Sequence, residues 1–166
     1  AEAAAPPPDV ARIREQLARD WPGLCRYQEA NAALAGKAPP RVVFMGDSIT
    51  QGWASKRPEF FAPNGFVGRG ISGQTTSQMV LRFHQDVVAL QPAVVVIIAG
   101  TNDVAENTGP ITDAQVIDNL ATMVEMARAH GEAFRDVRPV NTTVSIAGLV
   151  DPRWLLELDV VAVLSD

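Results

Sequence analysis

The chain contains short, largely apolar runs that are each followed by a small polar turn. They cover residues 41–46, 66–71 and 94–99, and the last is the most continuous, with Val94-Val95-Val96-Ile97-Ile98-Ala99. Runs of this length, rich in β-branched residues and bounded by glycine, predict buried strands of a parallel sheet.

Between these runs, apolar residues recur every three or four positions, which is the spacing of amphipathic helices. This spacing predicts helices within residues 10–21, 79–90 and 116–127. Thr112 is a suitable N-terminal cap for the third helix, which should end at Gly131. Because strand, turn and helix alternate along the chain, we expect an α/β fold with a parallel sheet.

The remaining segments have a less regular pattern. We expect a short helix over residues 24–34, with Cys25 on a half-buried face, and a loop over residues 51–65. Residues 140–150 favour another strand, whereas the periodicity of residues 154–164 fits a helix or a strand equally.

The 166-residue chain has the composition of one globular domain. It is 47% hydrophobic and 20% charged, which excludes wholesale disorder. A net charge of −5, with no visible cluster of Lys and Arg, argues against nucleic acid or an anionic membrane as a partner. The longest purely apolar run, residues 93–99, is too short to span a bilayer, so no transmembrane segment is expected.

We expect a single α/β domain over residues 41–166, with residues 1–40 forming a lead and helices that pack on it. The opening Ala1-Glu2-Ala3-Ala4-Ala5 resembles the start of a chain from which a signal peptide has been removed. We therefore expect a periplasmic or secreted protein.

The turn Gly46-Asp47-Ser48-Ile49-Thr50 follows the first predicted strand. In open α/β sheets the ligand crevice lies at the carboxyl ends of the strands, so the fold would deliver Ser48 to that crevice as a candidate nucleophile. Asp47 or Ser48 would serve equally well as an ordinary helix cap. The catalytic interpretation therefore depends on oxyanion donors and a base from other strand ends.

Two other strand ends offer such donors. Gly73 follows the second predicted strand, and its lack of a Cβ would let a substrate approach its amide closely. Asn102 follows the third and brings a side-chain N–H. With the backbone N–H of Ser48, these groups form a candidate oxyanion hole for acyl transfer. The alternative is that Asn102 and Asp103 are only turn and cap residues.

In this order, the three turns resemble the first three sequence blocks of the SGNH hydrolases, also called GDSL esterases and lipases. The blocks are Gly46–Thr50, Gly70–Thr75 and Gly100–Asp103, and the resemblance covers about residues 40–131. It implies a three-layer α/β/α sandwich with a flavodoxin-like sheet.

The resemblance also implies a role for each site residue. Ser48 would be the nucleophile, and Ser48, Gly73 and Asn102 would form the oxyanion hole. Asp47 would shape the nucleophile turn. Neither a metal nor another cofactor is expected.

The family carries a fourth landmark, a C-terminal Asp-x-x-His whose His is the general base. This chain has no such sequence: its only histidines are His84 and His130, both predicted to lie far along helices. Asp151-Pro152-Arg153-Trp154 has the acid but a tryptophan in place of the base. The general base is therefore unknown.

Three explanations stay open: a C-terminus that is truncated or altered in reading frame, a divergent member with another base, or a non-catalytic descendant. The first would leave the sheet incomplete at the C-terminus. An incomplete sheet edge would expose apolar surface and favour self-association.

The sequence thus predicts a serine ester hydrolase that cleaves a short-chain acyl or acetyl ester through an acyl-enzyme, impaired if the base is missing. The alternative is a non-catalytic domain that binds an acyl or carboxylate group. A nucleotide binder is disfavoured because none of the turns is a glycine-rich loop with a lysine. The expected partner is a small-molecule ester, with no nucleic acid.

Overall fold

The computed structural model describes residues 15, 17–133, 138–143 and 158–165. Of the helix predicted within residues 10–21, helical backbone is described at residue 15 and residues 17–19. The division of the chain at residue 40 stays a prediction.

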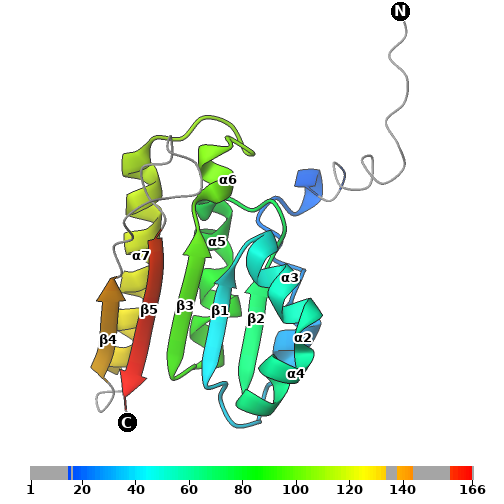
Figure 1. Ribbon diagram of the computed structural model, residues 1–166, viewed down its shortest axis with the longest axis vertical. Helices are drawn as coiled ribbons and strands as arrows, with labels where there is room; N and C mark the ends of the chain where they lie inside the picture. Colours follow the sequence, from blue (N-terminus) through cyan, green and yellow to red (C-terminus); the bar gives the residue numbers. More distant parts are fainter. Residues whose placement is uncertain (1–14, 16, 134–137, 144–157, 166) are drawn as a thin grey trace, which may run out of the picture.

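A five-stranded sheet forms the middle of the molecule, in the order β2-β1-β3-β5-β4 (Figure 1). Strand β1 lies between β2 and β3 and pairs with both in parallel. The parallel sheet expected from the three apolar runs is therefore confirmed. The strands are β1 (Val42–Gly46), β2 (Phe66–Gly70), β3 (Val94–Ala99), β4 (Arg138–Thr143) and β5 (Leu158–Ser165).

The two C-terminal strands add a feature that the sequence did not predict. Strand β5 pairs antiparallel with both β3 and β4, so β4 has the same direction as β1 to β3 and β5 alone is reversed. The crossover from β3 to β4 leaves one position open between them, and β5 fills it. Mixed sheets of this kind are common among α/β folds.

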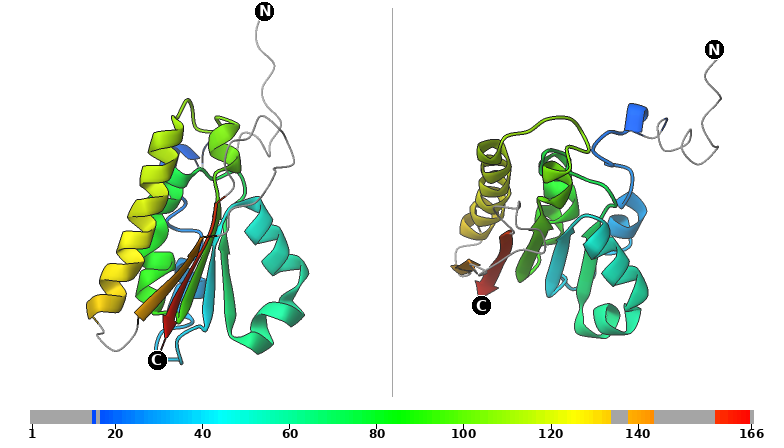
Figure 2. Two further views of the ribbon diagram at one scale, coloured as in Figure 1. Left: turned by 60° about the vertical axis from the view of Figure 1, so that its left-hand side comes forward. Right: turned by 45° about the horizontal axis from the view of Figure 1, so that its top comes forward.

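Helices cover both faces of the sheet, which confirms the expected three-layer arrangement. Helices α5 and α7 lie on one face, and α3 and α4 lie on the other (Figure 2). No helix in the described part of the chain is long and apolar enough to cross a membrane. The helices are α2 (Gln28–Ala32), α3 (Ser48–Lys56), α4 (Pro58–Phe61), α5 (Thr76–Asp86), α6 (Thr101–Val104) and α7 (Asp113–Ala133).

The loop predicted over residues 51–65 is wrong, because most of this segment is helical. Asp47 caps the start of α3, and Pro58 occupies the first position of α4, where its missing N–H is not needed. The aromatic side chains of these helices then pack against Phe44. Trp53 and Phe61 lie edge-on to its ring, at centroid distances of 5.1 and 5.2 Å.

Two further expectations need correction. Cys25 is exposed rather than half-buried, since the helix predicted over residues 24–34 is limited to Gln28–Ala32. Helix α7 continues past Gly131 to Ala133. A glycine in a helix interior costs about 1 kcal/mol, which is too little to end a long helix by itself.

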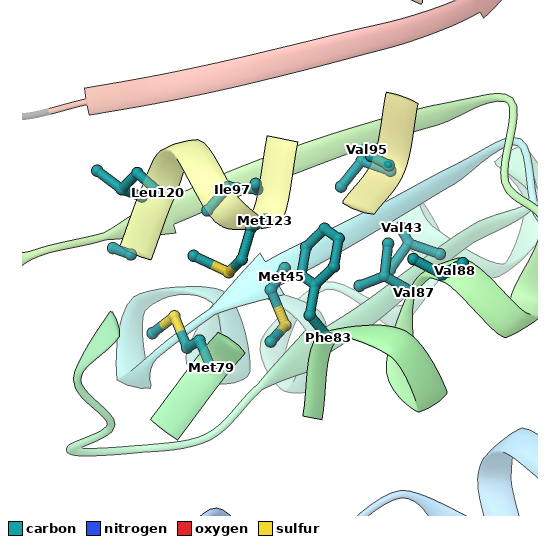
Figure 3. Packing of buried hydrophobic residues seen from close by; sticks show 12 residues of the cluster. Val43, Met45, Met79, Phe83, Val87, Val88, Val95, Ile97, Leu120 and Met123 are labelled. Carbon is teal, nitrogen blue, oxygen red and sulfur yellow. The ribbon is translucent and has the colours of Figure 1, made fainter. Parts of the chain in front are cut away.

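The apolar core lies between the sheet and the layer of α5 and α7. Figure 3 shows Met79 and Phe83 of α5 and Met123 of α7 packed on side chains of the central strands, among them Met45 and Val95. Each of these residues is at most 2% exposed. This core holds the central strands, and therefore their carboxyl ends, in place.

Candidate active site

The carboxyl ends of β1, β2 and β3 meet at one edge of the sheet. Gly46, the last residue of β1, is in register with Gly70 of β2 and Ile98 of β3. The three turns singled out in the sequence follow these strand ends directly (Figure 1). The fold therefore brings the three sequence blocks together.

Close backbone packing places the turn after β1 over the end of β2. A Cβ on Gly70 would lie 2.5 Å from the carbonyl oxygen of Asp47 and 2.3 Å from the amide nitrogen of Gln51. Real Cβ atoms do not approach backbone this closely, so only glycine allows α3 to begin at this position.

Asp47 is the N-terminal cap of α3, and Ser48 is the first residue of the helix. One oxygen of Asp47, Oδ1, accepts the N–H of Ile49 at 2.9 Å, and Asp47 is 1% exposed, whereas Ser48 is exposed. Burial raises the pKa of the Asp47 carboxyl, and the nearby Asp103 carboxylate acts in the same direction. The capping interpretation is thus right for Asp47, and the Ser48 hydroxyl takes no part in the cap.

Two backbone amides at this edge are free to donate. Within the described residues, the N–H groups of Ser48 and Gly73 have no hydrogen-bond acceptor. Gly73 has a φ of +79°, and a Cβ placed there would come no closer than 4.0 Å to any neighbour, the side chain of Asn107. Glycine is therefore required for its left-handed backbone rather than for lack of space.

The side chain of Asn102 connects the three turns. Its Nδ2 donates to Oδ2 of Asp47 at 3.0 Å and to the carbonyl of Gln74 at 2.9 Å. Its Oδ1 accepts from the side chain of Asn107 at 2.8 Å. Both N–H groups of the Asn102 amide are therefore engaged within the protein.

The comparison with known families agrees with this arrangement of strand ends. A model of the GDSL-like lipase/acylhydrolase family matches residues 44–159. The chain belongs to this family. Its members are described as lipases and acylhydrolases, which are hydrolases.

Individual relatives support the assignment. A crystal structure of a GDSL-like lipase from Bacteroides thetaiotaomicron is 53% identical in sequence, with a TM-score of 0.64, over 66% of this chain and 55% of that one. Esterase TesA from Pseudomonas aeruginosa is 33% identical over 106 residues, which are 57% of this chain and 51% of the relative. The uncharacterized lipoprotein YqeF from Bacillus subtilis is 31% identical over 117 residues, 60% of this chain and 48% of the relative. The chain spans about half the length of the curated relatives it matches.

Asp103 of this GDSL-like protein has a structural role. Its carboxylate is 1% exposed and accepts both the backbone N–H of Thr76, at 2.9 Å, and the hydroxyl of Thr76, at 2.6 Å. It therefore fixes the first residue of α5 beside the third turn. This geometry fits the cap alternative for Asp103.

A buried arginine beneath the candidate site was not predicted from the sequence. Arg82 of α5 is 0% exposed and donates to the carbonyl of Gly46 at 3.1 Å, the carbonyl of Arg69 at 2.9 Å and the side chain of Gln74 at 2.6 Å. It also forms an ion pair with Asp86 at 3.0 Å. Burial lowers the pKa of Arg82, an effect that the Asp86 carboxylate opposes. Arg82 thereby holds the ends of β1 and β2 together.

The segment before the first strand completes this network. The hydroxyl of Tyr27 donates to the carbonyl of Gly70, and Arg69 lies over the Tyr27 ring, 4.8 Å from its centroid. Asn31 accepts from Arg69 at 2.8 Å and donates to Asp86 at 2.7 Å. In the sequence, this network was indicated only by Arg82 and Asp86, which lie four residues apart on one predicted helix.

The described residues do not identify a general base. His84 is exposed in the last turn of α5, eight residues after Thr76, or about 12 Å along the helix. His130 lies near the C-terminal end of α7, and the sequence Asp151-Pro152-Arg153-Trp154 is outside the described residues. In the part of the chain that the structure describes, no group of three His, Cys, Asp or Glu side chains could hold a metal ion.

Proposed function

We propose that this protein is a serine hydrolase that cleaves a short-chain acyl or acetyl ester through an acyl-enzyme, with Ser48 as the nucleophile. The observation that carries the proposal is the exposed Ser48 at a helix N-terminus, at the same sheet edge as the two unengaged amides of Ser48 and Gly73. Membership of the GDSL-like family and the similarity to a protein named as an esterase support an ester substrate.

In the proposed reaction, Oγ of Ser48 attacks the carbonyl carbon of the ester. The carbonyl oxygen gains negative charge and accepts hydrogen bonds from the amides of Ser48 and Gly73, at the positive end of the α3 dipole. The alcohol then leaves with a proton, and water cleaves the acyl-serine to release the acid.

Asn102 and Asp47 have separate parts in this proposal. Asn102 serves as a third oxyanion donor by sharing one N–H that now bonds Asp47 or Gln74. Asp47 shapes the turn by capping α3 and by holding Asn102 in place.

The general base stays unassigned. In serine hydrolases, an oxyanion hole and substrate binding without a complete triad retain only about 10³ to 10⁴-fold catalysis over water. We therefore expect weak hydrolysis if no residue replaces the family histidine. The competing function, binding of an acyl or carboxylate group without turnover, is supported by the exposed position of His84 far along α5.

We further propose that the protein is periplasmic or secreted. The relative described as a lipoprotein is compatible with a protein of the cell envelope. The expected self-association stays a prediction.

Hydrolysis of p-nitrophenyl acetate by the purified chain, its Ser48→Ala variant and a Ser55→Ala control tests the proposal. Ser55 is another exposed serine of α3. We expect turnover and covalent labelling by a fluorophosphonate probe in the parent chain and in Ser55→Ala, with both lost in Ser48→Ala. Equal background rates in all three, with no labelling, would exclude hydrolysis. Binding of acetate or butyrate by an unreactive chain would favour the alternative.

A further inference from the structure

A second concave site lies beside the proposed active site, on the side of α5 and α7. It is a cavity of about 300 Å³ between the first turns of α5 and α7 and the loop that follows α6. Figure 1 shows these three elements meeting at the same end of the sheet. Its volume is at the lower end of the range for small-molecule sites. The lining residues that matter here are Trp21, Ser77, Thr108, Gln115, Asp118 and Asn119.

The wall of this cavity is built on the residues that hold the active-site turns. Asn119 donates to the hydroxyls of Thr76, at 3.0 Å, and Ser77, at 3.1 Å. Thr108 is hydrogen-bonded to Thr75 at 3.0 Å, and Thr75 lies two residues after Gly73. The cavity and the proposed oxyanion hole are therefore joined by a short, hydrogen-bonded wall.

Three planar polar groups of the lining have atoms without a hydrogen-bond partner among the described residues. Gln115 uses its Oε1 to cap α7 through Thr112, which leaves its Nε2 without an acceptor among the described residues. The carboxylate of Asp118 and the Oδ1 of Asn119 likewise accept no hydrogen bond within that part of the chain. The cavity thus offers one amide donor and several oxygen acceptors to a ligand.

An exposed aromatic ring lies at the same cavity. Trp21 is 41% exposed, and its position is set through its backbone, since its carbonyl accepts from the side chain of Gln78 at 2.6 Å. An indole offers a flat apolar face for stacking with little loss of side-chain entropy.

These features together select the ligand chemistry. Among the described residues of the lining, Asp118 is the only charged side chain, so an anionic ligand would be repelled. An alkyl chain would contact the tryptophan face but would pair with none of the polar groups of the lining. A quaternary ammonium ion would use the tryptophan face and the Asp118 carboxylate but neither carboxamide. A sugar ring matches all of them, because its C–H face stacks on indole while neighbouring hydroxyls bond carboxylate and carboxamide groups in pairs.

We propose that this cavity binds a neutral saccharide. Its further assignment, as the subsite for the alcohol part of a saccharide ester cleaved at Ser48, rests on the proposed function. Saccharide binding itself does not depend on that function.

Titration calorimetry of the full chain with glucose, xylose, galactose, cellobiose, xylobiose and lactose tests this site. We expect saturable binding of at least one sugar, weakened about tenfold or more by Trp21→Ala and by Asp118→Ala. Trp21→Tyr should retain most of the affinity, because the backbone bond to Gln78 and a stacking ring are kept. Trp53→Ala is the matched control, since Trp53 is 37% exposed but lies on α3, outside the cavity.

The possible results separate this site from the proposed hydrolysis. Ser48→Ala should bind the sugar as the parent chain does, so a loss of hydrolysis and a loss of binding can be told apart. No saturable binding by any sugar of the panel would overturn the proposal, as would binding that Trp21→Ala leaves unchanged. Binding of choline in place of sugars would show a cation site and would also overturn it.

Discussion

Helix α5 has two buried stripes that differ in chemistry. Met79 and Phe83, with Val87 directly after the helix, enter the apolar core, as Figure 3 shows, whereas Gln78, Arg82 and Asp86 enter a polar network. All six side chains are at most 2% exposed. Burial alone therefore does not separate the two stripes.

The stripes differ in what their contacts hold. The apolar stripe stabilises in proportion to the area it removes from water, without preferred directions. The polar stripe stabilises only when every member is paired, and its bonds end at defined atoms of Gly46, Arg69 and Gln74. We infer that the apolar stripe attaches α5 to the sheet, while the polar stripe sets the position of the strand ends that form the site.

Arg82→Met should have the largest effect. It leaves the Asp86 carboxylate buried without its cation, which typically costs about 3–5 kcal/mol. Urea unfolding measures this loss. Arg19→Met is the matched control, because Arg19 and Glu15 form a pair of the same spacing at the surface, and its loss should cost less than about 1 kcal/mol. Similar costs for the two variants would contradict a special role for the buried pair.

Met79→Ala should reduce the unfolding free energy by about 2–4 kcal/mol, through lost burial and a residual cavity. If the two stripes act separately, the folded variant should still react with a fluorophosphonate at the parent rate. Folded Arg82→Met should react more slowly. Equal labelling rates in the two folded variants would contradict separate roles for the apolar and polar stripes.

Asp103→Asn tests the contact that holds Thr76, the first residue of α5. It exchanges a charged acceptor of the Thr76 N–H and hydroxyl for a neutral one, which should cost about 1.5–3 kcal/mol. Urea unfolding beside Asp113→Asn, a change at the first turn of α7, checks the magnitude. An equal, small loss in both would show that the Asp103 charge is not needed.

Thr50→Val should raise the unfolding free energy by about 1 kcal/mol. The Thr50 hydroxyl is buried and has no hydrogen-bond partner among the described residues, so it lacks the pairing that the polar stripe of α5 has. Valine has nearly the same shape without the hydroxyl. A loss of stability on thermal unfolding would indicate a partner for this hydroxyl.

The smallest effect expected concerns Asp47 and pH. Because its pKa is raised in the folded state, the fold binds this proton more tightly than the unfolded chain does. Its contribution to stability is full below the unfolded pKa, near 3.9, and is lost as pH rises through the raised value. Asp47→Asn cannot ionise and should lack this loss. The difference in unfolding free energy between variant and parent should therefore shift in the variant's favour as pH rises above about 4. A shift in the opposite direction would contradict the raised pKa.

Local sequence patterns predicted the strands β1, β2 and β3 and the helices α5 and α7, because apolar periodicity and glycine turns act over a few residues. They also predicted that Ser48, Gly73 and Asn102 would follow three strand ends, which the structure places at one edge. Periodicity did not predict α3, because its one aromatic residue, Trp53, packs edge-on against Phe44 and is not part of a regular apolar face. The reversed direction of β5 depends on the position left open by the crossover between β3 and β4.

The sequence by itself determined the α/β order and the residue types at the strand ends. Only the tertiary structure decided that Asp47 caps α3, that Asn102 has both N–H groups engaged and that Arg82 is buried against Gly46. The physical reason is the range of the interactions. Propensity and periodicity are local, whereas the pairing of a buried polar group depends on which distant backbone or side-chain atoms the fold brings within hydrogen-bond distance.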